Sequence, residues 1–422
     1  MLSLKGAILL VVISISAYFF FKDDLPLHIE GTADKRFERV KAAFVQNFKD
    51  KWEHDGASIV VYYKGKKVVD LWGGYADRDC DRKWEEDTMM ILFSSSKSFG
   101  SLSIALLVDR GLLSYDDLVT KHWPQFGQNG KENVTVGMLL SHQAGLAYFD
   151  EDVNVHQAAD HKEISRRFEK QRPNWPPGTM SAYHALTHGW LVDQLIRRVD
   201  PAKRSIGQFV REEFHEKYGI DAYMGLPKEE AMRVARVYDT NKLDCTFELL
   251  TDFSKLKTAL KFLPFLTENS PMGQAFHNVP WMRVVGKLTV NNPQLWRLEQ
   301  AGALGISNAR GLAQLYDLVV RKQLISEATL SQLTQQRARM DFGSEDLSMP
   351  VATGLFMQKV DRAGTKYAYG HPGYGCQQGM MDLGNELAVG YTTNGMKMLI
   401  KDSCTTWDRL ISAIYDVIEN KT

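Results

Sequence analysis

A serine and a lysine stand three residues apart in the stretch Leu92–Phe99, where an apolar helical pattern begins. If a helix starts here, Ser94 and Lys97 lie about one turn apart on the same face. A serine hydroxyl is a weak nucleophile until a base takes its proton, and an amine made less basic by burial or by other cations can do so. The free N–H groups at a helix start also favour negative charge on a nearby oxygen. The spacing therefore suits acyl transfer to Ser94.

A Ser-x-x-Lys match is a weak signal by itself, because a chain of this length is expected to contain about one or two by chance. A second match, Ser254 with Lys257, lies in a lysine-rich amphipathic segment that is typical of a solvated helix face. Taken alone, Ser94 is better explained as a helix-capping serine beside a solvated lysine. Its interpretation depends on the residues that accompany it.

The bulk composition excludes some classes of function. Of the 422 residues, 44% are hydrophobic and 24% are charged, which is ordinary for one large globular domain or two smaller ones. Lys and Arg together number 51, as do Asp and Glu, so the basic excess of a nucleic-acid partner is missing. The four cysteines form no CxxC pair, which argues against a zinc ribbon and leaves their pairing open: Cys80, Cys245, Cys376 and Cys404.

An uncharged apolar run extends from Gly6 to Phe21, just after Lys5. As a helix it spans roughly 24 Å, slightly less than the ~30 Å hydrocarbon core of a bilayer. We therefore expect residues 1–24 to be a signal anchor, with a cleaved signal peptide as the alternative, and residues 25–422 to be the folded domain. The positive flank would stay cytoplasmic, which predicts a single-pass type II membrane protein, or a secreted one, with a lumenal or extracellular catalytic domain.

Two consequences follow from that topology. The cysteines would be exposed to an oxidising compartment. The sequence Asn133-Val134-Thr135 would be available for N-glycosylation at Asn133, whereas a second match at Asn420 is close to the chain end and expected to be poorly used.

Strand-like patterns occur at both ends of the chain, and helical patterns fill the middle. Residues 57–63 and 67–72 predict a hairpin around Gly65, and residues 380–383 and 387–393 predict a second antiparallel pair. Helical patterns cover residues 33–52, 180–198 and 404–419. The sequence thus predicts an α+β protein with an antiparallel sheet built from both chain ends, flanked by helices, and a mostly helical inserted subdomain over about residues 98–345.

In combination, three motifs make the chain resemble the serine β-lactamase and penicillin-binding-protein superfamily, most closely its class C-like serine hydrolases and family VIII carboxylesterases. They are Ser94-x-x-Lys97, Tyr183 in the stretch 177–183, and the late His371-Pro372-Gly373. Their order and wide separation match the family's S-x-x-K, Y-x-N and K-T-G motifs. Residues 140–146 are also similar to its LLSHTSGL segment. The resemblance covers nearly everything after Gly31 and implies a β-lactamase/transpeptidase-like fold.

The resemblance also implies a division of labour. Ser94 would be the acylated nucleophile, and Lys97 and Tyr183 would share its proton, each tuning the pKa of the other. A tyrosine pKa is ordinarily near ~10, so Tyr183 would be a good base at neutral pH only if a cation such as Lys97 lowered that pKa.

Further roles concern the late motif. The backbone N–H groups of Ser94 and Tyr374 would form an oxyanion hole, and Gly373 would let the backbone approach the substrate closely. His371 would lie on an edge strand that lines the site. No cofactor and no metal are implied.

Two departures from the family pattern bear on the substrate. The asparagine expected two residues after Tyr183 is Ala185, and the lysine of K-T-G is His371. Lysine offers a permanent cation to a carboxylate-bearing amide, whereas histidine, with an ordinary pKa near ~6.5, is mostly neutral at pH 7. The sequence therefore favours an esterase acting on small uncharged esters, with His371 neutral. A D-alanyl peptide, amide or β-lactam hydrolase with the same chemistry is one alternative, and a non-enzymatic scaffold or ectodomain is another.

The remaining histidines have simpler explanations. His184 and His188 are four residues apart on the expected helix, a spacing that can hold zinc, but the zincin pattern requires Glu where this chain has Ala185. Helix packing is the favoured interpretation of both. His142 is interpreted as a packed or capping residue, with a place in the site as the less favoured alternative. Tyr183 could likewise be a core aromatic.

Overall fold

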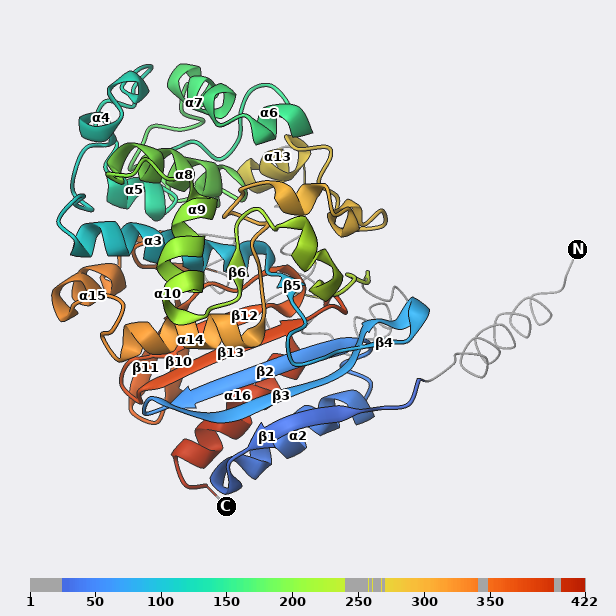
Figure 1. Ribbon diagram of the computed structural model, residues 1–422. Coiled ribbons are helices and arrows are strands. Elements are labelled where there is room, and N and C mark those ends of the chain that lie inside the picture. Colours follow the sequence, from blue (N-terminus) through green and yellow to red (C-terminus); the bar gives the residue numbers. More distant parts are fainter. Residues whose placement is uncertain are drawn as a thin grey trace, which may run out of the picture.

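An antiparallel sheet joins the two ends of the chain in the computed structural model (Figure 1). The strands β1 to β4 precede residue 84, and β8 to β13 follow residue 337. In spatial order the sheet contains β1 (Ile29–Ala33), β3 (Lys66–Asp77), β2 (Gly56–Tyr63), β13 (Leu387–Thr393), β12 (Gln378–Asp382), β11 (Thr365–Gly370), β10 (Phe356–Arg362), β9 (Met349–Val351) and β8 (Ala338–Met340), while β4 (Arg82–Lys83) pairs with β3. The predicted sheet from both chain ends is confirmed.

The residues that the structure describes are 25–239, 257, 260, 267, 270–340, 348–397 and 404–421. The predicted anchor at residues 1–24 lies outside them, as do Ser254 of the second Ser-x-x-Lys match and Cys245. In the described part of the chain, no helix is both long enough and apolar enough to cross a membrane.

Two helices cover one face of the sheet. Helix α2 (Glu38–Lys49) buries Val40, Phe44 and Phe48, which recur every four residues and so form one apolar stripe. This stripe packs with α16 (Thr405–Ile418), and Figure 1 shows the two helices together below the sheet. A disulfide between Cys376 and Cys404, whose Cα atoms are 5.8 Å apart, connects the sheet side to the start of α16.

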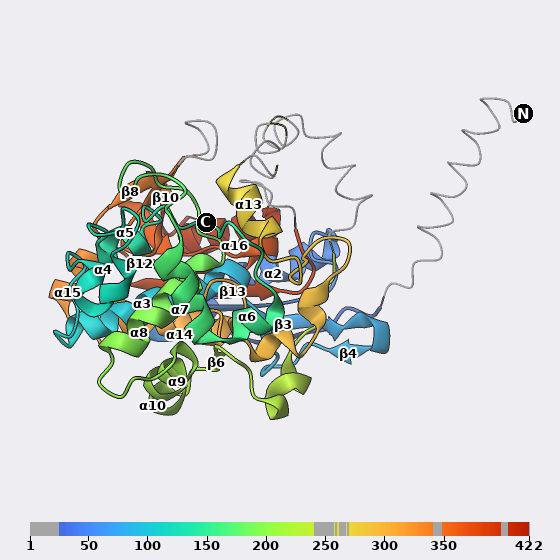
Figure 2. The same ribbon diagram turned by 90° about the horizontal axis from the view of Figure 1, so that it is seen from above.

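The other face carries α14 (Ala309–Val320) and, beyond it, a mostly helical subdomain (Figures 1 and 2). Its helices are α3 (Lys97–Asp109), α4 (Val119–His122), α5 (Val136–Leu140), α6 (Val155–Ala159), α7 (His161–Lys170), α8 (Thr187–Val199), α9 (Ile206–Val210), α10 (Glu216–Tyr218), α13 (Pro271–His277) and α15 (Glu327–Thr334). A small three-stranded sheet pairs β5 (Met90–Ile91) and β6 (Ala222–Tyr223) with the central strand β7 (Ile306–Ser307). The limits of an inserted subdomain at about 98–345 stay a prediction.

Helix α8 begins later than its sequence pattern indicates. The apolar pattern predicts a helix from Met180, but the helix starts at Thr187. The backbone N–H groups of Ala182 and His184 are bound by His142, so they cannot enter a helical ladder. Tyr183 therefore lies on an irregular segment, and His184 and His188 do not share one helix.

Candidate active site

Ser94 lies in a short 3-10 helix, Phe93–Ser96, that leads directly into α3. Phe93, the residue before Ser94, has a φ of +46°, in the left-handed region that non-glycine residues rarely adopt. The neighbouring hydroxyls fix this turn: Ser95 Oγ donates to the carbonyl of His371 at 2.8 Å, and Ser96 Oγ donates to that of Phe93 at 2.5 Å. The turn is thus attached directly to the late His371 segment.

The structure brings Ser94, Lys97 and Tyr183 together. Lys97 Nζ lies 3.3 Å from Ser94 Oγ, and the Tyr183 hydroxyl donates to the same Oγ at 2.6 Å. Lys97 Nζ is also 4.8 Å from the centre of the Tyr183 ring. Residues 89 positions apart in the chain therefore converge on one hydroxyl group.

Lys97 is fully buried, and its polar contacts are neutral. Besides Ser94 Oγ, its Nζ donates to the carbonyls of Ala185 at 2.7 Å and Gly302 at 2.6 Å. Burial lowers the pKa of Lys97 well below its usual value. In a neutral amine two N–H groups serve the two carbonyls, which leaves the nitrogen lone pair for the proton of Ser94.

Tyr183 differs from the prediction. Burial raises the pKa of its hydroxyl above the ordinary value, and the hydrogen bond with Ser94 opposes this only in part. The condition for a basic Tyr183, a pKa lowered by Lys97, is not met, because a buried lysine whose own pKa is depressed supplies no permanent cation. The geometry fits a protonated Tyr183 that donates to Ser94 and a basic Lys97.

His371 follows β11 and packs beside Tyr183, with the two ring centres 6.0 Å apart. It does not lie on an edge strand, since β11 is paired on both sides, with β10 and β12. Its side chain is 2% exposed, and burial places its pKa well below the ordinary histidine value. Its neutral state therefore extends to lower pH than its residue type alone indicates.

Gly373 and Tyr374 form the turn after His371. The Gly373 N–H donates to the carbonyl of Gln377 at 2.8 Å, and a Cβ at Gly373 would meet the carbonyl of Leu92 at 2.3 Å. Glycine is therefore required here for packing against the Ser94 turn, whatever the substrate demands. The Tyr374 ring contacts Phe93 edge-on, with centres 5.4 Å apart, and an oxyanion role for the N–H groups of Ser94 and Tyr374 stays a prediction.

Three further histidines are buried behind Tyr183: His142, His184 and His188. His184 uses both ring nitrogens in hydrogen bonds, to the carbonyl of Ala182 and from the N–H of Leu146. Within the described residues, no group of three or more His, Cys, Asp or Glu side chains is arranged to hold a metal ion. Sequence reasoning gave these histidines no joint role because His142 is 42 residues from His184.

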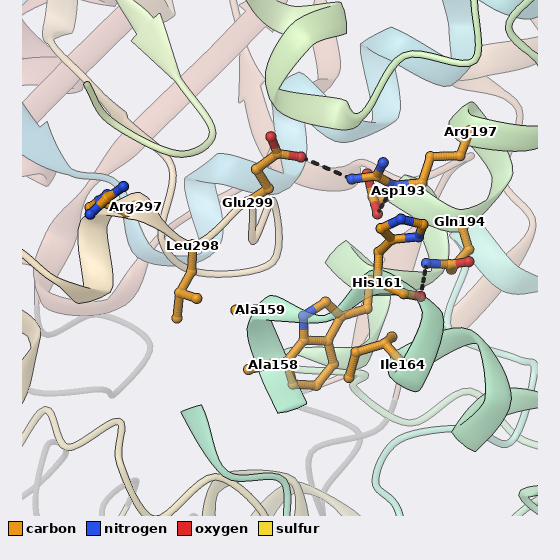
Figure 3. A pocket seen from close by; sticks show the side chains of 11 residues that line it. Ala158, Ala159, His161, Ile164, Asp193, Gln194, Arg197, Arg297, Leu298 and Glu299 are labelled. Atoms are coloured by element: carbon orange, nitrogen blue, oxygen red, sulfur yellow. Dashed lines mark hydrogen bonds and ion pairs between the residues drawn. The ribbon is translucent and has the colours of Figure 1, made fainter. Parts of the chain in front are cut away.

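A cavity of about 230 Å³ lies elsewhere, along the later part of α8 (Figure 3). Its lining includes Trp190, His161 and Leu298, but none of the predicted site residues. Its polar side chains are largely matched to one another, since Arg197 binds Asp193 at 2.7 Å and Glu299 at 3.1 Å. The cavity is separate from the chemistry at Ser94.

Comparison with known proteins places these features in context. The sequence matches the family described as Beta-lactamase over residues 43–410. It is 29% identical over 367 residues to the esterase/beta-lactamase LipL of Mycobacterium tuberculosis, covering 85% of this chain and 81% of that protein. A family VIII carboxylesterase structure has a TM-score of 0.79 and 29% identity, covering 92% of this chain and 100% of the other. A penicillin-binding-protein homologue from Caulobacter crescentus has a TM-score of 0.77 and 31% identity over the same shares.

Proposed function

Because the chain belongs to the beta-lactamase family, we propose that it is a serine hydrolase that forms an acyl-enzyme on Ser94 and acts on small uncharged esters. The observation that carries this proposal is Lys97: a fully buried amine, without a carboxylate among its hydrogen-bond partners, 3.3 Å from the Ser94 hydroxyl. Because burial depresses the pKa of Lys97, its amine can be neutral near pH 7 and accept the proton of the adjacent serine hydroxyl.

In the proposed acylation, Lys97 Nζ takes the proton of Ser94 Oγ as this oxygen attacks the ester carbonyl carbon. The Tyr183 hydroxyl, which donates to Ser94 Oγ, stabilises the charge on that oxygen before the bond forms. When the carbon–oxygen bond to the leaving group breaks, the proton held by Lys97 passes to the departing alkoxide, which leaves as the alcohol. Water then attacks the acyl carbon while Lys97 accepts its proton, and this proton passes to Ser94 Oγ as the acyl–oxygen bond breaks and the acid leaves.

The preference for uncharged substrates rests on the electrostatics of the site. His371 occupies the position of the family's lysine, and burial keeps it neutral. Lys97 is engaged by Ser94 and two carbonyls, so it is not available to a substrate carboxylate. A carboxylate-bearing β-lactam or peptide would therefore lose the permanent cation that favours its binding.

A fluorophosphonate probe tests the nucleophile directly. Wild type should be labelled at Ser94, Ser94→Ala should not, and the matched control Ser254→Ala in the second Ser-x-x-Lys match should be labelled at the wild-type rate. Parallel turnover of short-chain p-nitrophenyl esters, peptide amides and a β-lactam then ranks the acyl donors. An unlabelled wild type would support the scaffold alternative, and faster turnover of amides than of esters would favour the amidase alternative.

We also propose that residues 1–24 hold the domain in the lumen or outside the cell and that Asn133 carries a glycan. Two observations support this topology. Asn133 is exposed in the turn before α5, and Cys376 forms a disulfide with Cys404, a bond that persists in oxidising compartments. Glycosidase treatment of the protein from secretory cells should lower its mass, and Asn133→Gln should abolish the shift. An unchanged wild-type mass would argue against this topology.

A further inference from the structure

Tyr183 lies on a segment that has no regular secondary structure of its own. The residues from Ser181 to Leu186 precede α8 and form neither helix nor strand. Even so, the hydroxyl of Tyr183 is held 2.6 Å from Ser94 Oγ. Something outside the segment must therefore fix its backbone.

His142 binds this backbone on both sides of Tyr183. Its carbonyl oxygen accepts from the N–H of Ala182 at 3.1 Å, and its ring Nδ1 accepts from the N–H of His184 at 3.1 Å. The imidazole ring also packs against the Tyr183 ring, with centres 5.0 Å apart. One residue thus holds the peptide before the tyrosine, the peptide after it and the aromatic ring between them.

The conformation of His142 is itself unusual. Its φ is +62°, in the left-handed region, where a non-glycine residue is strained and persists only if its surroundings hold it there. The side chain is 2% exposed. A φ in the ordinary helical range would redirect both the carbonyl and the ring, and the two hydrogen bonds around Tyr183 would not both survive.

The contact with His184 also selects one protonation state of His142. Nδ1 must be an acceptor, so the ring proton resides on Nε2 and the imidazole is neutral. The titratable groups that face the ring are His188, His184, Lys97, His371 and Tyr183, and none of them offers a negative charge, because burial raises the pKa of Tyr183. Burial and these neighbours keep the pKa of His142 well below its ordinary value.

We propose that His142 is a positioning residue: by binding the peptides on both sides of Tyr183, it holds the tyrosine hydroxyl in hydrogen-bond contact with Ser94. This inference rests on the proposed function, because it assigns His142 an effect on acylation through Tyr183. His142 itself does not touch the reacting atoms.

Three substitutions separate this role from simple packing. In His142→Asn the side-chain amide oxygen takes the place of Nδ1, and asparagine tolerates positive φ. His142→Leu removes the acceptor, and His142→Gln moves it outward to the position of Nε2. Since a displacement of about 1 Å can cost ~10²-fold in rate, we expect His142→Leu and His142→Gln to lower kcat by roughly that factor with little change in KM. His142→Asn should retain most of the wild-type kcat.

The decisive measurement is the effect of His142→Leu on kcat in a protein that lacks the Tyr183 hydroxyl. In a Tyr183→Phe background, His142→Leu should cause no further loss of kcat, because its effect passes through the missing hydroxyl. An additional loss equal to that in wild type would overturn the proposal, as would equal kcat values for the Asn and Leu variants. If His142→Leu does not fold by circular dichroism, His142→Gln replaces it in both backgrounds. Fluorophosphonate labelling of wild type at Ser94 is measured alongside, since its absence would refute the proposed function itself.

Discussion

Buried ionisable groups lie on both faces of the large sheet, and the partners of Glu53 and Asp382 on one face differ from those of the bases around Ser94 on the other. On the face of α2 and α16, Glu53 accepts hydrogen bonds from Lys397 Nζ at 2.6 Å and Thr393 at 2.7 Å. The Asp382 carboxylate, which is fully buried, accepts from Thr365 and Tyr415, each at 2.8 Å. On this face each of the two buried carboxylates has polar or charged partners.

On the opposite face, the buried bases around Ser94 and Tyr183 have no carboxylate partner. Lys97 is bound by a hydroxyl and two carbonyls, and burial depresses its pKa. The pKa of His184 is lowered to about 4, and those of three further buried histidines fall well below their ordinary values: His142, His188 and His371. A buried charge that keeps its partner stays ionised, whereas a buried base without a countercharge loses its proton and is available for chemistry.

The largest effect that would test this comparison is expected from Lys97→Met. Removing the base should lower kcat/KM by at least ~10²–10⁴-fold in ester turnover, while the free energy of unfolding stays the same or rises, because an unpaired buried amine is replaced by an apolar side chain. Steady-state kinetics and urea denaturation measure the two quantities. Lys257→Ala is the control and should change neither. Substantial activity in Lys97→Met would refute its role as the base.

Substitution of Lys397, which is paired with Glu53 on the other face, should change stability and not activity. Lys397→Met leaves the Glu53 carboxylate buried without its cation, which should lower the free energy of unfolding by about 3 kcal/mol. The kcat of the protein that remains folded should match wild type. If Lys397→Met unfolds with the wild-type free energy, the pairing of Lys397 with Glu53 does not stabilise the fold. If the variant is fully stable but loses activity, Lys397 acts in catalysis as Lys97 does.

The smallest effect concerns the pH dependence of stability. A histidine whose folded pKa is depressed lets the unfolded chain bind a proton first, so stability falls as pH drops from about 6.5 toward the folded pKa. Each such histidine contributes up to ~1.4 kcal/mol per pH unit in that window. His188→Leu should therefore reduce the slope of unfolding free energy against pH by about 1 kcal/mol per pH unit between pH 6.5 and 5.5, where the unfolded histidine is only partly protonated. An unchanged slope would mean that His188 is not held neutral.

Local sequence patterns predicted the parts of the fold that depend on local interactions. The hairpin around Gly65, the helix buried through Phe44 and the closing helix all follow from residue periodicity and turn residues, and each is present. The contact between Ser94 and Lys97 could also be predicted locally, because residues three positions apart are separated by nearly one helical turn.

The features that sequence reasoning missed depend on distant contacts. The N–H groups of Ala182 and His184 donate to His142, so α8 starts only at Thr187, which periodicity near Met180 does not reveal. The raised pKa of Tyr183 comes from burial, which only the folded structure defines. The Cys376–Cys404 pair was likewise undetermined, because four scattered cysteines allow several pairings.

The pairing of β2 with β13 has a consequence for biosynthesis. The ribosome makes β2 (residues 56–63) early. The strand β13, which pairs with its free edge and places Val389 opposite Val61, is among the last parts to be translated. At ~5–20 residues per second, the early hairpin waits roughly 15–60 s for its neighbour. An apolar strand with an unpaired edge is a template for aggregation. The nascent chain is therefore expected to need a chaperone at this edge until the C-terminal strands emerge.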